Sequence, residues 1–174
     1  MNRRRWLALL ITAQVLLLGG IAGSYYAVDA MGKEIQLRTK PVDPRNLLYG
    51  DYAHLHYEIS DVPRQLWRGD EESLQNEPVH VLLSPQKTIY RVKGVYPDRP
   101  ETSEEEVVLQ AKASSFGEQI HLKYGLERYY VPENTGKTLE GQRRPMRVRV
   151  KVAPWGQAKI SALEPYPEKS STYR

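Results

Sequence analysis

The chain has 174 residues, which is room for one ordinary domain and one additional element. It carries 25 Lys and Arg against 21 Asp and Glu, and setting Arg3, Arg4 and Arg5 aside leaves 22 basic residues against the same 21 acidic ones. The rest of the chain is therefore nearly neutral, which argues against nucleic acid as a partner. Because there is no cysteine, disulfides, thiolate catalysis and Cys-based zinc sites are excluded.

An uncharged stretch from Trp6 to Val28 follows the three arginines. As a helix it would be about 34 Å long, enough to cross the core of a bilayer. Two interpretations are open: a cleaved signal peptide, with Val28-Asp29-Ala30 as the cleavage site, and a permanent anchor. We expect an uncleaved signal anchor, since the stretch exceeds the apolar length of most signal peptides and Trp6, Tyr25 and Tyr26 mark its ends as interfacial aromatic residues do.

The arginine triplet also predicts orientation. Positive charge before a membrane helix keeps the N-terminus in the cytoplasm, so we expect a single-pass protein of the cytoplasmic membrane with an extracytoplasmic C-terminal domain. Residues 1–30 are then the arginine cap and the transmembrane anchor. Residues 31–165 form one extracytoplasmic β-rich domain, and residues 166–174 a flexible tail.

Small residues lie at helical spacing within the apolar stretch. Gly19 and Gly23 form a GxxxG motif, which lets a second helix backbone approach closely. Two interpretations stay open. The glycines are merely tolerated in lipid, or this face of the helix packs against another membrane helix.

Strand patterns begin directly after the membrane segment. Glu34 to Lys40 alternates between apolar and polar side chains, and Pro41 ends the strand. Asp43-Pro44-Arg45-Asn46 predicts a type I turn, which sends the chain back into a strand that begins near Tyr52. That strand would place Tyr52, His54, His56 and Glu58 on a wet face and Ala53, Leu55, Tyr57 and Ile59 on the core side.

The segment from Asp61 to Asn76 is the least strand-like, and Arg64 to Trp67 predicts one short helical turn. Turn residues then separate a series of further strands. They are predicted at Val79–Leu83, Thr88–Tyr96, Val107–Ala113, Gln119–Leu122, Tyr129–Val131, Met146–Val152 and Ala158–Leu163.

The pattern predicts a mainly β fold: one N-terminal transmembrane helix followed by a compact antiparallel β-barrel or β-sandwich-like domain. Twelve tyrosines against one phenylalanine suit a thin β-domain, because tyrosine packs on pleated surfaces and keeps a polar tip near water or a partner.

The wet face of the strand from Tyr52 is the first candidate for chemistry. His54, His56 and Glu58 could supply three metal ligands, and His80 and His121 are the only other histidines. Alternate residues of one strand are about 7 Å apart, however, so such ligands need a partner strand to converge. We therefore expect a polar strand face, with no metal and no cofactor.

A second candidate is Asp51 with Tyr52 and Tyr57, a carboxylate beside two phenols. Nothing nearby in the sequence supplies an activated nucleophile and its base. We expect Asp51 to bind the turn and Tyr57 to lie in the core, and we predict no catalytic residue.

The same stretch carries a family resemblance. Gly50-Asp51-Tyr52-Ala-His-Leu55-His-Tyr57 matches every fixed position of the motif of the GDYXXLXY protein family. Pro41-Val-Asp-Pro-Arg45 resembles the family's upstream proline turn. Tyr124-Gly-Leu-Glu-Arg-Tyr-Tyr-Val-Pro-Glu133 resembles its second block, with Asn134 where glycine usually follows. The resemblance covers most of residues 35–163.

The resemblance implies a bacterial protein with an N-terminal membrane anchor and no assigned activity, often accompanying a polytopic membrane protein. His54 and His56 stand at unspecified motif positions, which weakens the metal interpretation. The residues that the motifs mark as structural or binding are Pro41, Asp43, Pro44, Arg45, Gly50, Asp51, Tyr52, Leu55, Tyr57, Tyr124, Gly125, Glu127, Tyr129, Pro132 and Glu133.

We therefore expect a non-enzymatic interaction or accessory module for a polytopic membrane protein; the sequence names no small-molecule ligand. The alternative is an envelope hydrolase or metal-dependent enzyme that uses the face around His54 and His56. A pocket lined by those histidines together with His80 or His121 would favour the enzyme. A continuous apolar or tyrosine-rich patch beside the helix would favour the module.

Overall fold

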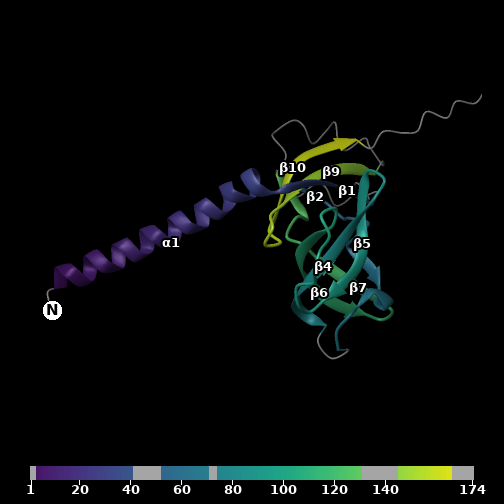
Figure 1. Cartoon of the computed structure of the whole chain (residues 1–174), viewed down its shortest axis with the longest axis horizontal. Helices are drawn as coiled ribbons and strands as arrows, with labels where there is room; N and C mark the ends of the chain where they lie inside the picture. The colour runs from purple at the N-terminus through teal and green to yellow at the C-terminus, as the bar shows by residue number, and fades with distance from the viewer. Residues whose placement is uncertain (1–2, 41–51, 71–73, 131–144, 166–174) are drawn as a thin grey trace, which may run out of the picture.

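The computed structural model describes residues 3–40, 52–70, 74–130 and 145–165. They form one long helix, α1 (Arg3–Met31), and a β-domain at its C-terminal end (Figure 1). At about 1.5 Å per residue, α1 is about 43 Å long. It is long and apolar enough to cross a membrane. Its side chains are mostly exposed, and Val28, where the helix meets the β-domain, is fully buried.

The β-domain contains three antiparallel sheets. The first has the order β1-β9-β10, the second pairs β2 with β8, and the third has the order β3-β7-β6-β4-β5. The strands are β1 (Lys33–Arg38), β2 (Tyr52–His54), β3 (Asp61–Pro63), β4 (Gln75–Gln86), β5 (Ile89–Tyr96), β6 (Val107–Phe116), β7 (Gln119–Lys123), β8 (Arg128–Tyr130), β9 (Met146–Val152) and β10 (Ala158–Pro165).

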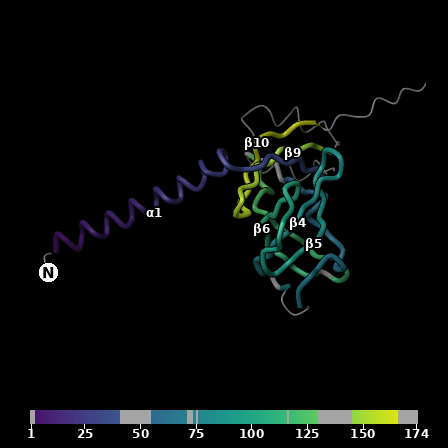
Figure 2. The backbone as a smooth tube through the Cα atoms, in the orientation of Figure 1, coloured from purple at the N-terminus to yellow at the C-terminus, as the bar shows by residue number. Residues whose placement is uncertain are grey.

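The two larger sheets curl toward each other, and β1 lies beside β5 (Figures 1 and 2). Along their strands, apolar residues alternate with polar ones, and the apolar side chains point into one shared core. In β9, for example, Val148, Val150 and Val152 are buried between partly exposed charged residues. The fold is thus mainly β, a nearly closed antiparallel barrel or sandwich, which confirms the predicted class. The remaining core side chains from the large strands are Ile35, Leu37, Val79, Val81, Leu83, Val95, Val107, Leu109, Ala111, Ala113, Ile120 and Leu122.

Most predicted strands are present, with β9 at the predicted bounds. The strand β4 is longer at both ends than its prediction, Val79–Leu83, because Pro78 and Pro85 interrupt the sequence pattern. Both prolines lie where β4 pairs on one side only: Pro78 pairs with β6 and Pro85 with β5. A proline is tolerated there because it lacks an N–H, and on the unpaired side of the strand no N–H is needed for a hydrogen bond.

Two local predictions change. The predicted helical turn after Pro63 is present as a 3₁₀-helix, η2 (Arg64–Leu66), but the three residues before it form β3, within the segment expected to be the least strand-like. The strand predicted from Tyr52 through Ile59 is wrong: β2 ends at His54, and Glu58 and Ile59 form a turn. Pairing with β8 ends at His54, and the following residues bond to other elements instead.

We call residues 55–60 the connecting segment, because its backbone bonds to both halves of the domain. On one side His56 accepts from the Lys40 amide at 2.7 Å, and the Glu58 amide donates to Arg38 at 2.9 Å. On the other side the Leu55 amide donates to Glu127 and Ser60 accepts from the Leu122 amide, each at 2.7 Å. The connecting segment therefore joins the end of β1 to the end of β7 and the start of β8.

Tyr57 fixes this segment from within the core. Its side chain is fully buried, and its hydroxyl donates to the carbonyl of Leu126 at 2.8 Å. Burial raises the pKa of Tyr57, and the charge of Glu127 adds to the rise, so the phenol stays a neutral donor.

Replacing Tyr57 by Phe keeps the ring and removes that donor from a buried carbonyl. We expect the free energy of unfolding to fall by about 1–3 kcal/mol. The matched control is Tyr90→Phe, whose hydroxyl donates to the exposed Glu105 carbonyl at 3.0 Å; water replaces that donor, so the loss should stay below about 0.5 kcal/mol. Denaturant unfolding of the full chain in detergent measures both, and equal losses would contradict a central role for Tyr57.

Candidate functional site

Two polar clusters flank the connecting segment, one around Asp61 and one around Glu58. Asp61 is the first residue of β3, and the antiparallel register places it opposite His121 of β7. One carboxylate oxygen of Asp61 lies 2.6 Å from Lys40 Nζ and 2.7 Å from His56 Nε2. The other lies 2.8 Å from His121 Nδ1. Three elements therefore converge on one carboxylate.

The two imidazoles of this cluster stack. Their ring centroids are 6.0 Å apart with 15° between the planes. Burial by itself would raise the pKa of Asp61, but hydrogen bonds from Lys40, His121 and His56, with the Lys40 charge, outweigh it and hold the pKa well below its usual range. The carboxylate is therefore ionised throughout the physiological range.

An imidazole held by a carboxylate can act as a general base, so the chemistry of this cluster has to be weighed. Within the described ranges, no hydroxyl is hydrogen-bonded to either imidazole. No group of three or more His, Asp or Glu side chains in the same ranges is arranged to hold a metal ion. Among the described residues, the cluster thus has a base and its orienting acid but no hydroxyl nucleophile bonded to the base.

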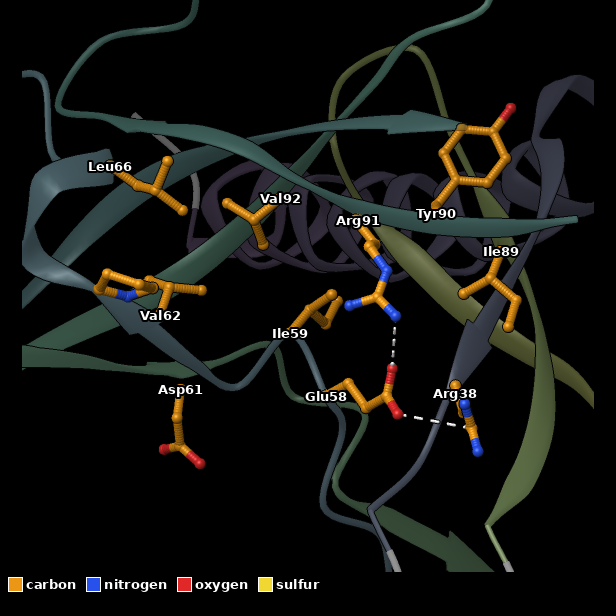
Figure 3. A pocket seen from close by; sticks show the side chains of 11 residues that line it. Arg38, Glu58, Ile59, Asp61, Val62, Leu66, Ile89, Tyr90, Arg91 and Val92 are labelled. Carbon is orange, nitrogen blue, oxygen red and sulfur yellow. Dashed lines mark ion pairs between the residues drawn. The ribbon is translucent and has the colours of Figure 1, made fainter. Parts of the chain in front are cut away.

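The second cluster lines a groove of about 190 Å³ at the seam between β5 and the segment leading into η2 (Figure 3). The Glu58 carboxylate lies between two arginines, 3.4 Å from Arg38 Nε and 3.4 Å from Arg91 Nη2. Arg91 stays 51% exposed despite this contact. We call this the seam groove; its lining residues are Arg38, Glu58, Ile59, Asp61, Val62, Pro63, Leu66, Ile89, Tyr90, Arg91 and Val92.

One wall of the seam groove is formed by β5, from which four consecutive residues, Ile89–Val92, line it. In its sheet, β5 pairs with β4 alone. On the other side, the only backbone–backbone hydrogen bond that β5 makes within the described chain is near its end, where the Arg68 amide donates to the Val95 carbonyl at 2.9 Å.

The structure separates the residues proposed as metal candidates. His56 points to Asp61, whereas Glu58 points into the seam groove between its arginines. His54 ends β2, and its side chain is outside the described part. His80 lies elsewhere, with Nδ1 3.2 Å from the Pro97 carbonyl. The wet strand face expected from the sequence is therefore not a single surface.

The two motif blocks meet at the connecting segment. Leu55 and Tyr57 are buried, and the Tyr124 hydroxyl donates to the Ile59 carbonyl at 2.8 Å. Glu127 accepts from the Tyr124 amide at 2.6 Å, closing a turn in which Gly125 has φ of 76°, a value that favours glycine. Tyr129 lies in β8 and packs against the core, and the backbone of Tyr52 pairs with Tyr130.

The other marked residues lie outside the described part of the chain: Pro41, Asp43, Pro44, Arg45, Gly50, Asp51, Pro132 and Glu133, together with the predicted tail, 166–174.

Gly19 and Gly23 leave open space along α1. A Cβ atom added at either would meet nothing within 4 Å, and the same is true at Gly20. The glycines are therefore not required for packing within this chain.

Sequence reasoning missed Asp61, Lys40, His121, Arg38 and Arg91 as members of these clusters. His121 is visible in the sequence as one of four histidines, but only the pairing register of β3 and β7 brings it next to Asp61. Nothing in the local pattern marks Arg91, which reaches Glu58 across the seam.

The family comparison agrees with the motif. A family model described as GDYXXLXY protein matches residues 14–163. The comparisons with curated proteins and with solved structures gave no match.

Replacing Asp61 by Asn tests the electrostatics of the first cluster. A carboxylate with a lowered folded pKa stabilises above its unfolded pKa, near 3.9, and loses that contribution as pH falls toward the folded value. Because its partners are about 40% exposed, we expect a cost of about 1–2 kcal/mol at pH 7 that shrinks below about pH 4. Unfolding across pH measures it. Asp98→Asn, in an exposed bend, is the control, and a cost at Asp61 that does not change with pH would contradict the assignment.

Proposed function

The chain belongs to the GDYXXLXY protein family, and from its fold and its seam groove we propose a membrane-anchored β-domain that is a non-enzymatic accessory module for a polytopic membrane protein. The observation that carries the proposal is the groove itself: a strand that pairs in its sheet on one side only, an apolar floor and two arginines that share one carboxylate. The family resemblance supports the class of partner.

The proposed location is argued from α1. The helix is apolar enough to span a bilayer, with Arg3, Arg4 and Arg5 at one end and the β-domain at the other. The positive-inside rule supports a cytoplasmic N-terminus and an extracytoplasmic β-domain. The β-domain then lies next to the outer surface of the membrane, where it can meet the exposed loops of a polytopic protein.

The chemistry of the seam groove favours an extended segment of that partner. A peptide in extended conformation can lie along the part of β5 that lines the groove, and backbone hydrogen bonds to the unpaired side of that strand would then supply affinity. Ile59, Val62 and Leu66 offer apolar contacts on the floor. Arg91 is 51% exposed beside Glu58, so it is the cation of the groove that an acidic side chain on the segment can pair with.

The alternative, an envelope hydrolase or metal enzyme, has one observation in its favour: His56 and His121 converge on Asp61. The groove contains Asp61 but neither histidine. In the described residues the imidazoles have no hydroxyl partner, so the cluster supports structural pairing better than nucleophilic catalysis. We therefore keep the accessory module as the proposed function.

Co-purification from native membranes tests the proposal. Arg91→Glu reverses the charge at the groove and should reduce recovery of the partner by at least about tenfold, since like charges at an interface cost several kcal/mol. Lys112→Glu, exposed on β6 and outside the groove, is the matched control and should leave recovery unchanged. Unfolding measurements exclude a general loss of stability, and equal recovery with both variants would contradict binding at the groove.

The same co-purification experiment can be carried out with variants in α1. Gly19→Leu with Gly23→Leu should abolish the complex if that face packs on a partner helix, whereas Gly20→Leu, about 100° away, should not. Because none of the three additions meets another group of this chain, a difference between them reports a partner. Unchanged recovery with both variants would limit the interface to the β-domain.

A further inference from the structure

The turn between β9 and β10 carries the one exposed large apolar side chain that the structure describes outside α1. Trp155 is 36% exposed, whereas every other exposed large apolar residue of the described chain lies in the helix. A large apolar side chain that is exposed on a β-domain is a candidate for contact with a partner or a membrane.

The topology places this turn at the membrane end of the β-domain. The strand β1 starts two residues after α1, and β9 runs antiparallel to it, so β9 returns toward the helix. Val152 pairs with Lys33 on one side and Ala158 on the other, and the turn from Ala153 to Gln157 extends beyond that pair. Figures 1 and 2 show the turn on the side from which α1 extends.

Contacts with the last turns of α1 show where the β9–β10 turn lies along the helix axis. Lys159, next to the turn, lies 2.6 Å from an Asp29 carboxylate oxygen and 5.6 Å above the ring of Tyr25. Lys151 of β9 donates to the Asp29 carbonyl at 3.0 Å. Asp29 is about 6 Å beyond Tyr25 along the helix axis. If Tyr25 and Tyr26 mark the outer interface of the bilayer, the turn stands at headgroup level.

The turn is held in place rather than left to fold on contact. The Gly156 amide donates to Ala153 at 2.9 Å, and β6 contributes two bonds from Gln110: its amide to Gly156 at 3.1 Å and its side chain to the Trp155 carbonyl at 3.2 Å. Arg99 donates to the Pro154 carbonyl. Gly156 has φ of 96°, and a Cβ there would lie 3.0 Å from Gln110. The hydrogen bonds of the turn therefore hold Trp155 in its exposed position before any contact with a membrane.

We infer that the β9–β10 turn binds the lipid headgroup layer of the same bilayer that α1 spans, with the indole of Trp155 in the interface. Tryptophan favours that layer because its ring is apolar while its N–H remains polar, and Nε1 here already has a polar neighbour, Gln157 Oε1, at 3.1 Å. The helix and the turn would give two attachment points, which orient the β-domain on the membrane. This inference rests on the proposed anchoring by α1.

The three tryptophans of the chain allow both claims to be measured separately. Trp6 lies near the start of α1 and reports the anchor; Trp155 reports the turn. Trp67 is 9% exposed, donates to the Asp70 carbonyl and serves as an internal reference. The full chain is reconstituted in phosphatidylcholine vesicles in which part of the lipid is brominated, either near the headgroup end or near the methyl end of the acyl chains.

In Trp6→Phe, which retains Trp67 and Trp155, bromine near the headgroup end should quench part of the emission more than bromine near the methyl end. The double variant Trp6→Phe with Trp155→Phe should lose that component. If the two variants are quenched alike while Trp155→Phe shows quenching of Trp6, the inference is overturned and the anchor stands. If Trp6 is not quenched either, the anchor and the inference fall together.

Discussion

The fold depends on one short segment that has to bond in two directions. Residues 55–60 leave the β2–β8 pair and pass between the end of β1 and the end of β7, and their amides and carbonyls have partners on both sides. The segment belongs fully to neither sheet, so its position is set by the buried Tyr57, whose hydroxyl reaches the Leu126 carbonyl. A buried phenol that donates to a buried carbonyl is costly to displace, which holds the two halves of the domain together.

The polar clusters follow from that constraint. Because the segment turns at Glu58 and Ile59 instead of continuing as a strand, its polar side chains separate: His56 reaches Asp61, and Glu58 enters the seam groove. The groove exists because β5 is the edge of its sheet and lies beside β1 without a ladder along that part. The family motif thus supplies the scaffold, and residues outside the motif, such as Arg91, supply its surface chemistry.

Local patterns predicted most strands. Strict alternation of valine with basic residues gave β9 at its observed bounds, and the uncharged stretch after Arg5 gave α1. The prediction failed where distant partners override the pattern: alternation continues through Ile59, but bonds to β1 and β7 end the strand at His54. The clusters depend on strand register and sheet order, as with Asp61 opposite His121, and neither is contained in local periodicity.

The central claim is that the seam groove binds a polytopic membrane protein, and crosslinking from within the groove in native membranes tests it most directly. A photo-crosslinking amino acid at Pro63, an exposed residue of the groove lining, should give an adduct that mass spectrometry identifies as such a protein. The same amino acid at Lys112, exposed on β6, should give no such adduct. Recovery of this chain alone from both positions would contradict the account.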